Sequence, residues 1–198
     1  MKNKCYFMLV IFCMSFIPLL VNAAPGKWQT AIFAGGCFWS MQHDFEHVPG
    51  VVSTTVGYTG GDVVNPTYEQ VSTGTTGDYE AIKITYDPDK TSYQTLLNFY
   101  WHDTDPTNGA GQFCDSGEEY HPVIFYLDKQ QKEMAENSEQ ALIQSKKFSH
   151  IATQILPAKP FYPAEEYHQH YSDKNPDAYN AYRTGCRRDM TRDAVWGN

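Results

Sequence analysis

The sequence predicts an α+β fold in which helices pack on a mixed or antiparallel sheet. Some segments are rich in β-branched residues or alternate with period two, and others carry apolar residues at helical spacing. The two kinds follow each other without the strict alternation of a doubly wound fold. Neither an internal repeat nor an interior linker interrupts them, so we expect one continuous domain.

Residues 29–35 (QTAIFAG) form an apolar run that ends in glycine, which predicts a buried strand. Apolar residues then recur at helical spacing over 38–48, and Pro49-Gly50 ends that helix. The β-branched stretch 51–58 predicts a second strand, and the alternating stretch 79–86 predicts a third.

A strong helical stripe of aromatic and leucine side chains covers 93–101. Residues 103–120 have no periodicity, and loops of that length inside compact domains are often functional. A strand is expected over 121–127, followed by a polar surface helix over about 129–147 with Asp128 as its N-cap.

The C-terminal part is expected to be long and largely irregular. Residues 151–157 (IATQILP) predict a strand, and Pro163 suits the first turn of a helix that runs to about Tyr171. Residues 182–197 combine glycine with basic side chains, as a mobile tail does.

The first 23 residues have the order of a secretory signal peptide: lysines, then an apolar run, then small residues. The alternative is an uncleaved anchor, although the apolar run over 5–21 is short for a membrane helix and contains Pro18. We expect cleavage after Ala23, which leaves a single catalytic domain over 24–198. Its expected location is the bacterial periplasm, with secretion as the alternative.

The charge excludes some classes of partner. The net charge is −8, and because the leader holds two lysines and no acidic residue, the remainder carries −10. This acidity argues against nucleic acid or an anionic membrane as the main partner, and we expect a monomer without stable membrane association. Cys37, Cys114 and Cys186 remain after cleavage, an odd number that leaves at least one thiol outside any disulfide.

Cys37 lies where a strand meets a helix. Gly35 and Gly36 permit a tight turn there, and the first turn of a helix offers free N–H groups and a positive dipole end. This position should lower the pKa of the thiol and favour the nucleophilic thiolate. The alternative is a buried cysteine that only packs in the core.

Two adjacent aromatic residues follow Cys37. Neighbouring side chains on a helix diverge by about 100°, so Phe38 and Trp39 do not both enter one core face. Trp39 is therefore free to form the wall of a pocket for a small apolar or thioether group, since sulfur packs well on aromatic rings.

Six segments in order resemble the A-type peptide methionine sulfoxide reductases, over about 31–171: GGCFWS, GYTGG, NPTYEQV, GDYEAIKITYDP, GQFCDSGEEY and FYPAEEYHQHY. The resemblance implies a ferredoxin-like core, no metal and no bound organic cofactor. It implies reduction of the S epimer of methionine sulfoxide, free or in oxidised proteins, with a thioredoxin-like reductant.

The resemblance also implies roles for single residues. Cys37 attacks the sulfoxide sulfur and becomes a sulfenic acid, Glu80 donates the proton, and Tyr68 and Tyr120 bind the sulfoxide oxygen. A carboxyl in an aromatic pocket keeps its proton near neutral pH because burial raises its pKa, which makes the role of Glu80 plausible. An outward carboxylate on a strand is the alternative.

Three further residues have substrate-binding roles by the same resemblance. Phe38 and Trp39 form the wall that receives the substrate methyl group, and Asp115 helps to bind the substrate. Without the resemblance, Asp115 would be an ordinary loop residue.

A second thiol must resolve the sulfenic acid. We favour Cys186 because a terminal segment moves easily, with Cys114 in the long loop as the alternative. Three positions depart from the family pattern: Ser40 replaces a glycine, Asp78 a histidine and His121 an arginine.

Other interpretations remain open. His168 and His170 suggest a metal site, but positions two apart diverge on the helix expected there, so we predict no metal. A cysteine hydrolase would need His43 or His47 beside Cys37. A thiol peroxidase and a non-catalytic exported binding domain are the remaining alternatives.

Overall fold

The computed structural model describes residues 28–197. A six-stranded sheet has the order β7-β6-β1-β3-β2-β8 and is antiparallel except between β6 and β7. Its strands are β1 (Gln29–Ala34), β2 (Val51–Thr59), β3 (Tyr79–Tyr86), β6 (Val123–Tyr126), β7 (Gln154–Pro157) and β8 (Tyr162–Pro163).

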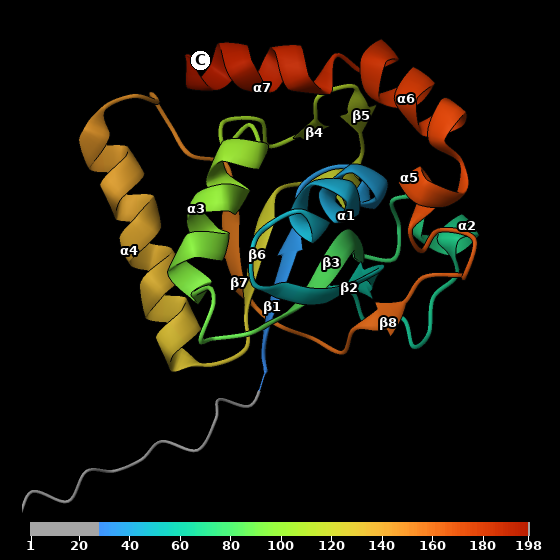
Figure 1. The fold of residues 1–198 in the computed structure, drawn as a ribbon, viewed down its shortest axis with the longest axis horizontal. Helices are drawn as coiled ribbons and strands as arrows, with labels where there is room; N and C mark the ends of the chain where they lie inside the picture. Colours follow the sequence, from blue (N-terminus) through green and yellow to red (C-terminus); the bar gives the residue numbers. More distant parts are fainter. Residues whose placement is uncertain (1–27, 198) are drawn as a thin grey trace, which may run out of the picture.

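The central part of the sheet has ferredoxin-like topology. The chain runs β1-α1-β2-β3-α3-β6, and the four strands lie in the order β6-β1-β3-β2. Helices α1 (Phe38–Glu46) and α3 (Tyr93–Asp103) pack on the sheet, with α4 (Lys129–Ser145) beside α3 (Figure 1). The expected α+β fold with a ferredoxin-like core is therefore confirmed.

One hydrophobic core joins the helices to the sheet. The alternation predicted for β3 turns Ile82 and Ile84 toward Met41 and Phe45 of α1, and all four are fully buried. The predicted N-cap is also present, because Asp128 accepts a hydrogen bond from the Gln131 N–H at 2.8 Å.

The segment 103–120 has more structure than its sequence predicts. It forms a hairpin of β4 (Gly111–Gln112) and β5 (Asp115–Ser116), followed by the 3-10 helix η1 (Glu118–Tyr120). The hairpin turns at Phe113 and Cys114, and Phe113 has φ of 55°. A short helix that the sequence did not predict, α2 (Tyr68–Val71), lies between β2 and β3.

Two predictions for the C-terminal part are wrong. The segment after Pro163 is not a helix but a series of turns that leads to α5 (Tyr171–Lys174). The expected irregular, mobile tail instead forms α6 (Pro176–Gly185) and α7 (Arg188–Trp196), which lie across one end of the molecule (Figure 1).

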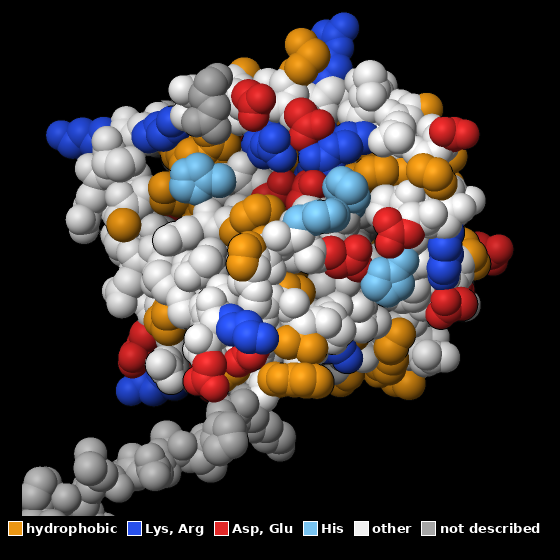
Figure 2. All heavy atoms as spheres, in the orientation of Figure 1, with side chains coloured by type: hydrophobic (Ala, Val, Ile, Leu, Met, Phe, Trp, Pro, Cys, Tyr) orange, Lys and Arg blue, Asp and Glu red, His pale blue; other side chains and the backbone are white. Residues whose placement is uncertain are grey.

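Ion pairs explain why this tail is ordered. The buried Arg188 contacts Asp103 at 2.8 Å, and Arg183 contacts Asp44 at 3.0 Å. The Trp196 indole N–H donates to the Thr104 carbonyl at 3.0 Å. Acidic and basic side chains gather where α6 and α7 meet the body (Figure 2). The basic residues that suggested a solvated tail are partners of acidic groups in the body.

The predicted signal peptide lies outside the described residues. Within residues 28–197, no helix combines the length and the apolar character needed to cross a membrane.

Candidate active site

Cys37 lies at the junction of β1 and α1. Gly36 has φ of 83°, and a Cβ on it would lie 2.7 Å from the Gln112 Cβ, so both the turn and the close approach require glycine. The Gly36 N–H donates to the Tyr120 carbonyl at 3.2 Å, which ties η1 to this junction. Cys37 is the N-cap residue of α1 and is 7% exposed.

Glu80 lies against the start of the same helix. It occupies the face of β3 that carries Ile82 and Ile84, because alternate strand residues share a face. Its carboxylate accepts a hydrogen bond from the Phe38 N–H at 3.0 Å and is 2% exposed. Burial raises the pKa of Glu80 to about 8, against the Phe38 hydrogen bond and with help from the charges of Asp115 and Glu119. The carboxyl is therefore protonated at neutral pH.

The expected low pKa of Cys37 is wrong for this state of the protein. Burial raises the pKa of the thiol, and the charges of Glu80 and Asp115 raise it further. Hydrogen bonds from the Trp39 N–H and the Tyr182 hydroxyl oppose this effect without overcoming it. The first free N–H of the helix, which was expected to stabilise the thiolate, binds Glu80 instead.

Asp115 holds the backbone of Cys37 and the side chain of Tyr182. It accepts hydrogen bonds from the Cys37 N–H and from the Tyr182 hydroxyl, the latter at 2.6 Å. Sequence reasoning missed Tyr182, whose hydroxyl contacts both the candidate nucleophile and Asp115. Its position four residues before Cys186 was the available signal.

The two predicted tyrosines meet beside Glu80. The hydroxyls of Tyr68 and Tyr120 share a hydrogen bond, and burial raises the pKa of each phenol, with the charge of Glu80 as the next contribution. Tyr68 comes from the start of α2 and Tyr120 from the end of η1. Two elements that were not predicted therefore bring these hydroxyls together.

Aromatic side chains surround the first turn of α1. Phe38 packs in a cluster with Tyr58 and Val56, while Trp39 stacks on Tyr171 with ring centroids 3.7 Å apart. Trp39 also packs against the cluster that holds Phe38, and both rings contact His168, so the expectation that Trp39 faces elsewhere is only partly met. The Trp39 indole N–H donates to His168 Nδ1 at 2.9 Å, which fixes the orientation of the ring.

The turns that follow Pro163 support this site. Glu165 accepts hydrogen bonds from the Tyr58 hydroxyl and the Tyr68 N–H, both at 2.8 Å. His168 is buried between the rings of Phe38 and Tyr68. Sequence reasoning did not assign these supporting roles, because it expected a helix here.

Cys114 and Cys186 form a disulfide in this structure, and Cys37 is the free cysteine among residues 28–197. Cys114 is exposed at the hairpin tip, whereas Cys186 is 7% exposed at the end of α6. The Cys114 N–H donates to the Cys186 sulfur at 3.2 Å. The two candidates for the resolving thiol are therefore partners of each other.

The three departures from the family pattern have different surroundings. Ser40 is fully buried in α1, and Asp78 accepts a hydrogen bond from the Gly61 N–H at 3.0 Å. His121 lies 3.6 Å from the Glu118 carboxylate. Burial is the main cause of the raised pKa of Glu80, and the groups that act on it are Phe38, Asp115 and Glu119 rather than these three positions.

The histidines lie in other environments. His168 bonds to Trp39, whereas His170 forms an ion pair with Glu46 at 2.7 Å and lies near Asp173. The His47 ring donates a hydrogen bond to the His43 carbonyl on the exposed side of α1. The structure thus brings carboxyl and phenol groups to Cys37, and the contacts of His43 and His47 lie elsewhere.

The site can reduce a polar S–O or O–O bond with a thiol. It holds a thiol, a carboxyl that keeps its proton at neutral pH and two phenols around one point, and a disulfide lies next to it through Asp115 and Tyr182. These groups define a thiol-dependent oxidoreductase.

The chain belongs to the peptide methionine sulfoxide reductase family, whose model matches residues 29–198. It is 51% identical over 175 residues to peptide methionine sulfoxide reductase MsrA 2 of Caulobacter vibrioides, covering 88% of each chain. It is 53% identical over 169 residues to MsrA of Ligilactobacillus salivarius, covering 85% of this chain and 98% of the relative.

Solved structures agree with the sequence relatives. Methionine sulfoxide reductase A of Corynebacterium diphtheriae matches with a TM-score of 0.68 at 32% identity, over 80% of this chain and 81% of that one. Reduced Mxr1 of Saccharomyces cerevisiae matches with a TM-score of 0.70 at 32% identity, over 77% and 88%.

Proposed function

We propose that this protein reduces methionine sulfoxide to methionine, with Cys37 as nucleophile and Glu80 as proton donor. The observation that carries the proposal is the position of a buried, protonated carboxyl at the first turn of the helix that Cys37 begins. Family membership supports the same reaction.

The chemical step transfers the sulfoxide oxygen to the thiol. The Cys37 sulfur attacks the sulfoxide sulfur while Glu80 protonates the oxygen, which forms a sulfur–sulfur bond. The hydroxyl then passes to the Cys37 sulfur as this bond and the methionine S–O bond break, and the products are methionine and Cys37 sulfenic acid. The thiol proton replaces the one that Glu80 gives up, so the step is balanced without a metal. Tyr68 and Tyr120 donate hydrogen bonds to the oxygen as charge develops on it.

The aromatic groups bind the rest of the methionine side chain. Phe38 and Trp39 form the wall that receives the terminal methyl group, by dispersion and sulfur–aromatic contact. Asp115 acts on the substrate through its position beside Cys37 and Tyr182. The proposed substrates are the S epimer of methionine sulfoxide in oxidised proteins and free methionine sulfoxide, so the function is protein repair under oxidative stress.

The sulfenic acid is resolved in two exchanges. Cys186 follows Tyr182 by one helical turn, so we assign the first attack to it: a Cys37–Cys186 disulfide forms and water leaves. Cys114 then attacks the Cys186 sulfur, which yields the Cys114–Cys186 bridge and frees the Cys37 thiol. Cys114 and Cys186 thereby act in sequence rather than as alternatives.

A thioredoxin-like dithiol supplies the two electrons that reopen this bridge. Its thiolate attacks the exposed Cys114 sulfur, and Cys186 leaves as a thiolate that the Cys114 N–H stabilises. The second thiol of the reductant then attacks the mixed disulfide, releases Cys114 and leaves the reductant oxidised.

We further propose that residues 1–23 are a leader that is removed on export, and that 24–198 act as a monomeric catalytic domain in the periplasm. The apolar leader sequence and the acidic remainder support this proposal. Amino-terminal sequencing of the protein from a periplasmic extract tests it, and an intact Met1 on membrane-bound protein contradicts it.

Acetyl-methionine sulfoxide with dithiothreitol tests the reaction. The wild type should form acetyl-methionine, Cys37→Ser should form none, and Cys114→Ser should remain active because dithiothreitol reduces the sulfenic acid directly. Turnover by Cys37→Ser overturns the nucleophile. Consumption of hydrogen peroxide without any reduction of the sulfoxide would instead identify a peroxidase.

Mass mapping tests the order of the exchanges. Reduced Cys114→Ser treated with one equivalent of substrate should accumulate a Cys37–Cys186 disulfide, and Cys186→Ser should accumulate a sulfenic acid that dimedone traps. A Cys37–Cys114 disulfide that forms in Cys186→Ser at the wild-type rate contradicts the assignment of the first attack to Cys186.

A further inference from the structure

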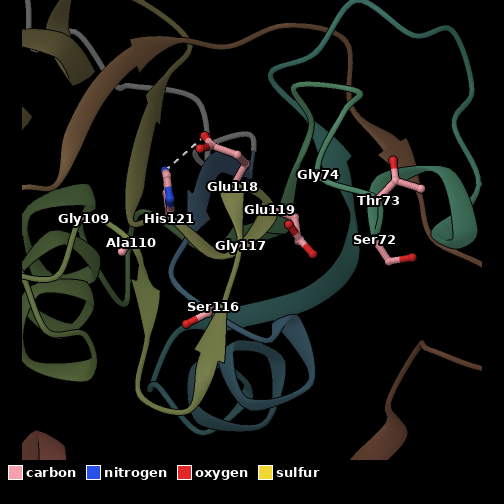
Figure 3. A pocket seen from close by; sticks show the side chains of 10 residues that line it. All are labelled: Ser72, Thr73, Gly74, Gly109, Ala110, Ser116, Gly117, Glu118, Glu119 and His121. Atoms are coloured by element: carbon pink, nitrogen blue, oxygen red, sulfur yellow. Dashed lines mark ion pairs between the residues drawn. The ribbon is translucent and has the colours of Figure 1, made fainter.

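Glu119 projects into a cavity beside the active site. The cavity has a volume of about 530 Å³ and lies between the end of α2, the hairpin β4–β5 and η1 (Figure 3). Small and polar residues form most of its lining, with Glu118, Glu119 and His121 as its ionisable groups.

The Glu119 side chain is largely buried, and its carboxylate has no partner in the described part of the chain. The residue is only 6% exposed, and no side chain or backbone N–H among residues 28–197 donates a hydrogen bond to it or forms an ion pair with it. The carboxylate oxygens face the cavity, so a cation that enters the cavity can pair with Glu119 there.

The backbone makes room for this carboxylate. A Cβ on Gly117 would lie 2.5 Å from Glu119 Oε2, and one on Gly74 would lie 3.7 Å from the same atom. The carboxylate therefore lies between two glycines and is directed into the space between Gly117 and the Ser72–Thr73 segment (Figure 3). Glu118, by contrast, turns to His121 at 3.6 Å and is exposed at the rim.

The cavity adjoins the place where the reaction occurs. Glu119 precedes Tyr120 in η1, and successive side chains of a 3-10 helix diverge by about 120°. Tyr120 thus faces the proposed position of the sulfoxide oxygen, while Glu119 faces the cavity. Strand β3, which carries Glu80, also contacts η1.

We propose that this cavity binds the lysine or arginine side chain of a residue next to methionine sulfoxide in a polypeptide substrate, with Glu119 as its counter-ion. This inference rests on the proposed function. Successive Cα atoms of an extended chain are about 3.8 Å apart, so a neighbouring residue lies within a long side chain's reach of the cavity. A cation supplies a partner for the carboxylate, whereas an acidic neighbour is repelled.

Blocked pentapeptides with a central methionine sulfoxide test the proposal. Lysine, norleucine or glutamate is placed, one position at a time, at the two positions before the methionine sulfoxide and the two after it. The value of kcat/KM is then measured for the wild type and for Glu119→Gln. In at least one position the wild type should prefer lysine over norleucine by about tenfold, the lower range for a hydrogen bond to a charged group. The order should be lysine, norleucine, glutamate.

Glu119→Gln keeps the shape and removes the charge, so the ratio of lysine to norleucine should fall to about one. Glu133→Gln, an exposed acid on α4 that pairs with Lys129, is the matched control and should keep the wild-type ratio. Because the ratio is taken within each variant, a general loss of activity does not alter it.

Several results overturn the proposal. Equal kcat/KM for lysine and norleucine peptides at all four positions does so, as does a lysine preference that persists in Glu119→Gln. The proposal is also contradicted if a positive charge raises kcat/KM only when it is the free α-amino group of unblocked methionine sulfoxide. Absence of turnover with acetyl-methionine sulfoxide is a different outcome, because it removes the proposed function itself.

Discussion

At the scale of single residues, Cys37 and Glu80 share an environment that keeps both protonated. Burial is the first cause of the raised pKa of each group, and the charge of Asp115 raises both pKa values further. The thiol is therefore not a free nucleophile at rest. In the proposed mechanism, the thiol loses its proton as the sulfoxide oxygen accepts one from Glu80, so reactivity would be confined to the bound substrate.

The first prediction concerns the pH dependence of the chemical step. Because Glu80 is the proposed proton donor and burial raises its pKa to about 8, the wild-type rate should fall as pH rises above 8. Glu80→Gln should lose about 10²–10⁴-fold in rate, the usual contribution of general acid catalysis, and should lack this fall. Methionine formed in a single turnover of reduced enzyme measures the step without interference from the reductant.

An unchanged alkaline limb in Glu80→Gln would assign the fall to another group. Tyr120→Phe serves as a second variant, since it removes a proposed oxygen contact but keeps the carboxyl, and its alkaline limb should remain.

The second prediction concerns stability and the same carboxyl. The pKa of the Glu80 carboxyl is 4.5 in the unfolded chain and about 8 in the folded protein. Between pH 4.5 and 8, folding therefore takes up a proton. Stability from this group is present below pH 4.5 and is lost as pH rises to about 8. The free energy of unfolding of Glu80→Gln should therefore rise relative to that of the wild type between pH 4.5 and 8, and the difference should be constant at higher pH.

Urea unfolding of both proteins at several pH values measures this difference. Glu133→Gln, with an exposed side chain on α4, should show no such trend. A constant difference between Glu80→Gln and the wild type over this range would contradict a raised pKa in the folded state.

At the scale of elements, the C-terminal helices hold the redox pair against the body. Arg188 of α7 is buried against Asp103 at the end of α3, and its guanidinium lies 4.5 Å from the centre of the Phe113 ring at the hairpin tip. One side chain thus links the helix after Cys186 to the turn that carries Cys114.

The third prediction tests that link. Arg188→Met leaves the buried Asp103 with only the longer contact to Arg192, at 3.5 Å, so the free energy of unfolding should fall by about 3 kcal/mol. Arg188→Met with Asp103→Asn should recover a large part of the loss, because the uncompensated charge is gone. Denaturant unfolding of the single and double variants measures both changes.

Additive losses in the double variant would show that the two groups act independently. Arg187→Met is the matched control: its exposed side chain is the neighbour in sequence, and we expect a change within about 0.5 kcal/mol.

At the scale of the whole molecule, a long-range disulfide closes the chain. The Cys114–Cys186 bridge spans 72 residues and connects the hairpin to the end of α6. A loop of this size contributes about 4 kcal/mol through the entropy of the unfolded chain. The catalytic cycle therefore alternates between a more stable oxidised form and a less stable reduced form.

The fourth prediction follows from this alternation. Reduction should lower the melting temperature of the wild type, while Cys114→Ser with Cys186→Ser should melt at the temperature of the reduced wild type under both conditions. Calorimetry with and without reductant measures the shift. Equal melting temperatures for oxidised and reduced wild type would show that the bridge does not stabilise the fold.

The core of the fold could be predicted from sequence because its signals are local. The alternation over 79–86 and the helical stripes over 38–48 and 93–101 each define one buried face, and all three elements are present. The hairpin β4–β5 and α2 are too short for periodicity, so their residues looked like loop.

The C-terminal helices were missed for a different reason. The charged residues of 182–197 have no apolar stripe, and their stability comes from Asp44 and Asp103, which lie far away in the chain. Only tertiary contact distinguishes such a segment from a solvated tail. The same contact shows Tyr182 at Cys37 and pairs Cys114 with Cys186.

The sequence alone determined the family and the sheet with its covering helices, and it predicted candidate residues for the chemistry, since these depend on residue type and short spacing. The tertiary structure decided their charge states and partners. The pKa of Cys37 is raised because burial and two carboxylates outweigh the helix N-terminus, and within residues 28–197 Glu119 is left unpaired in its cavity. Both facts depend on groups that only folding brings together.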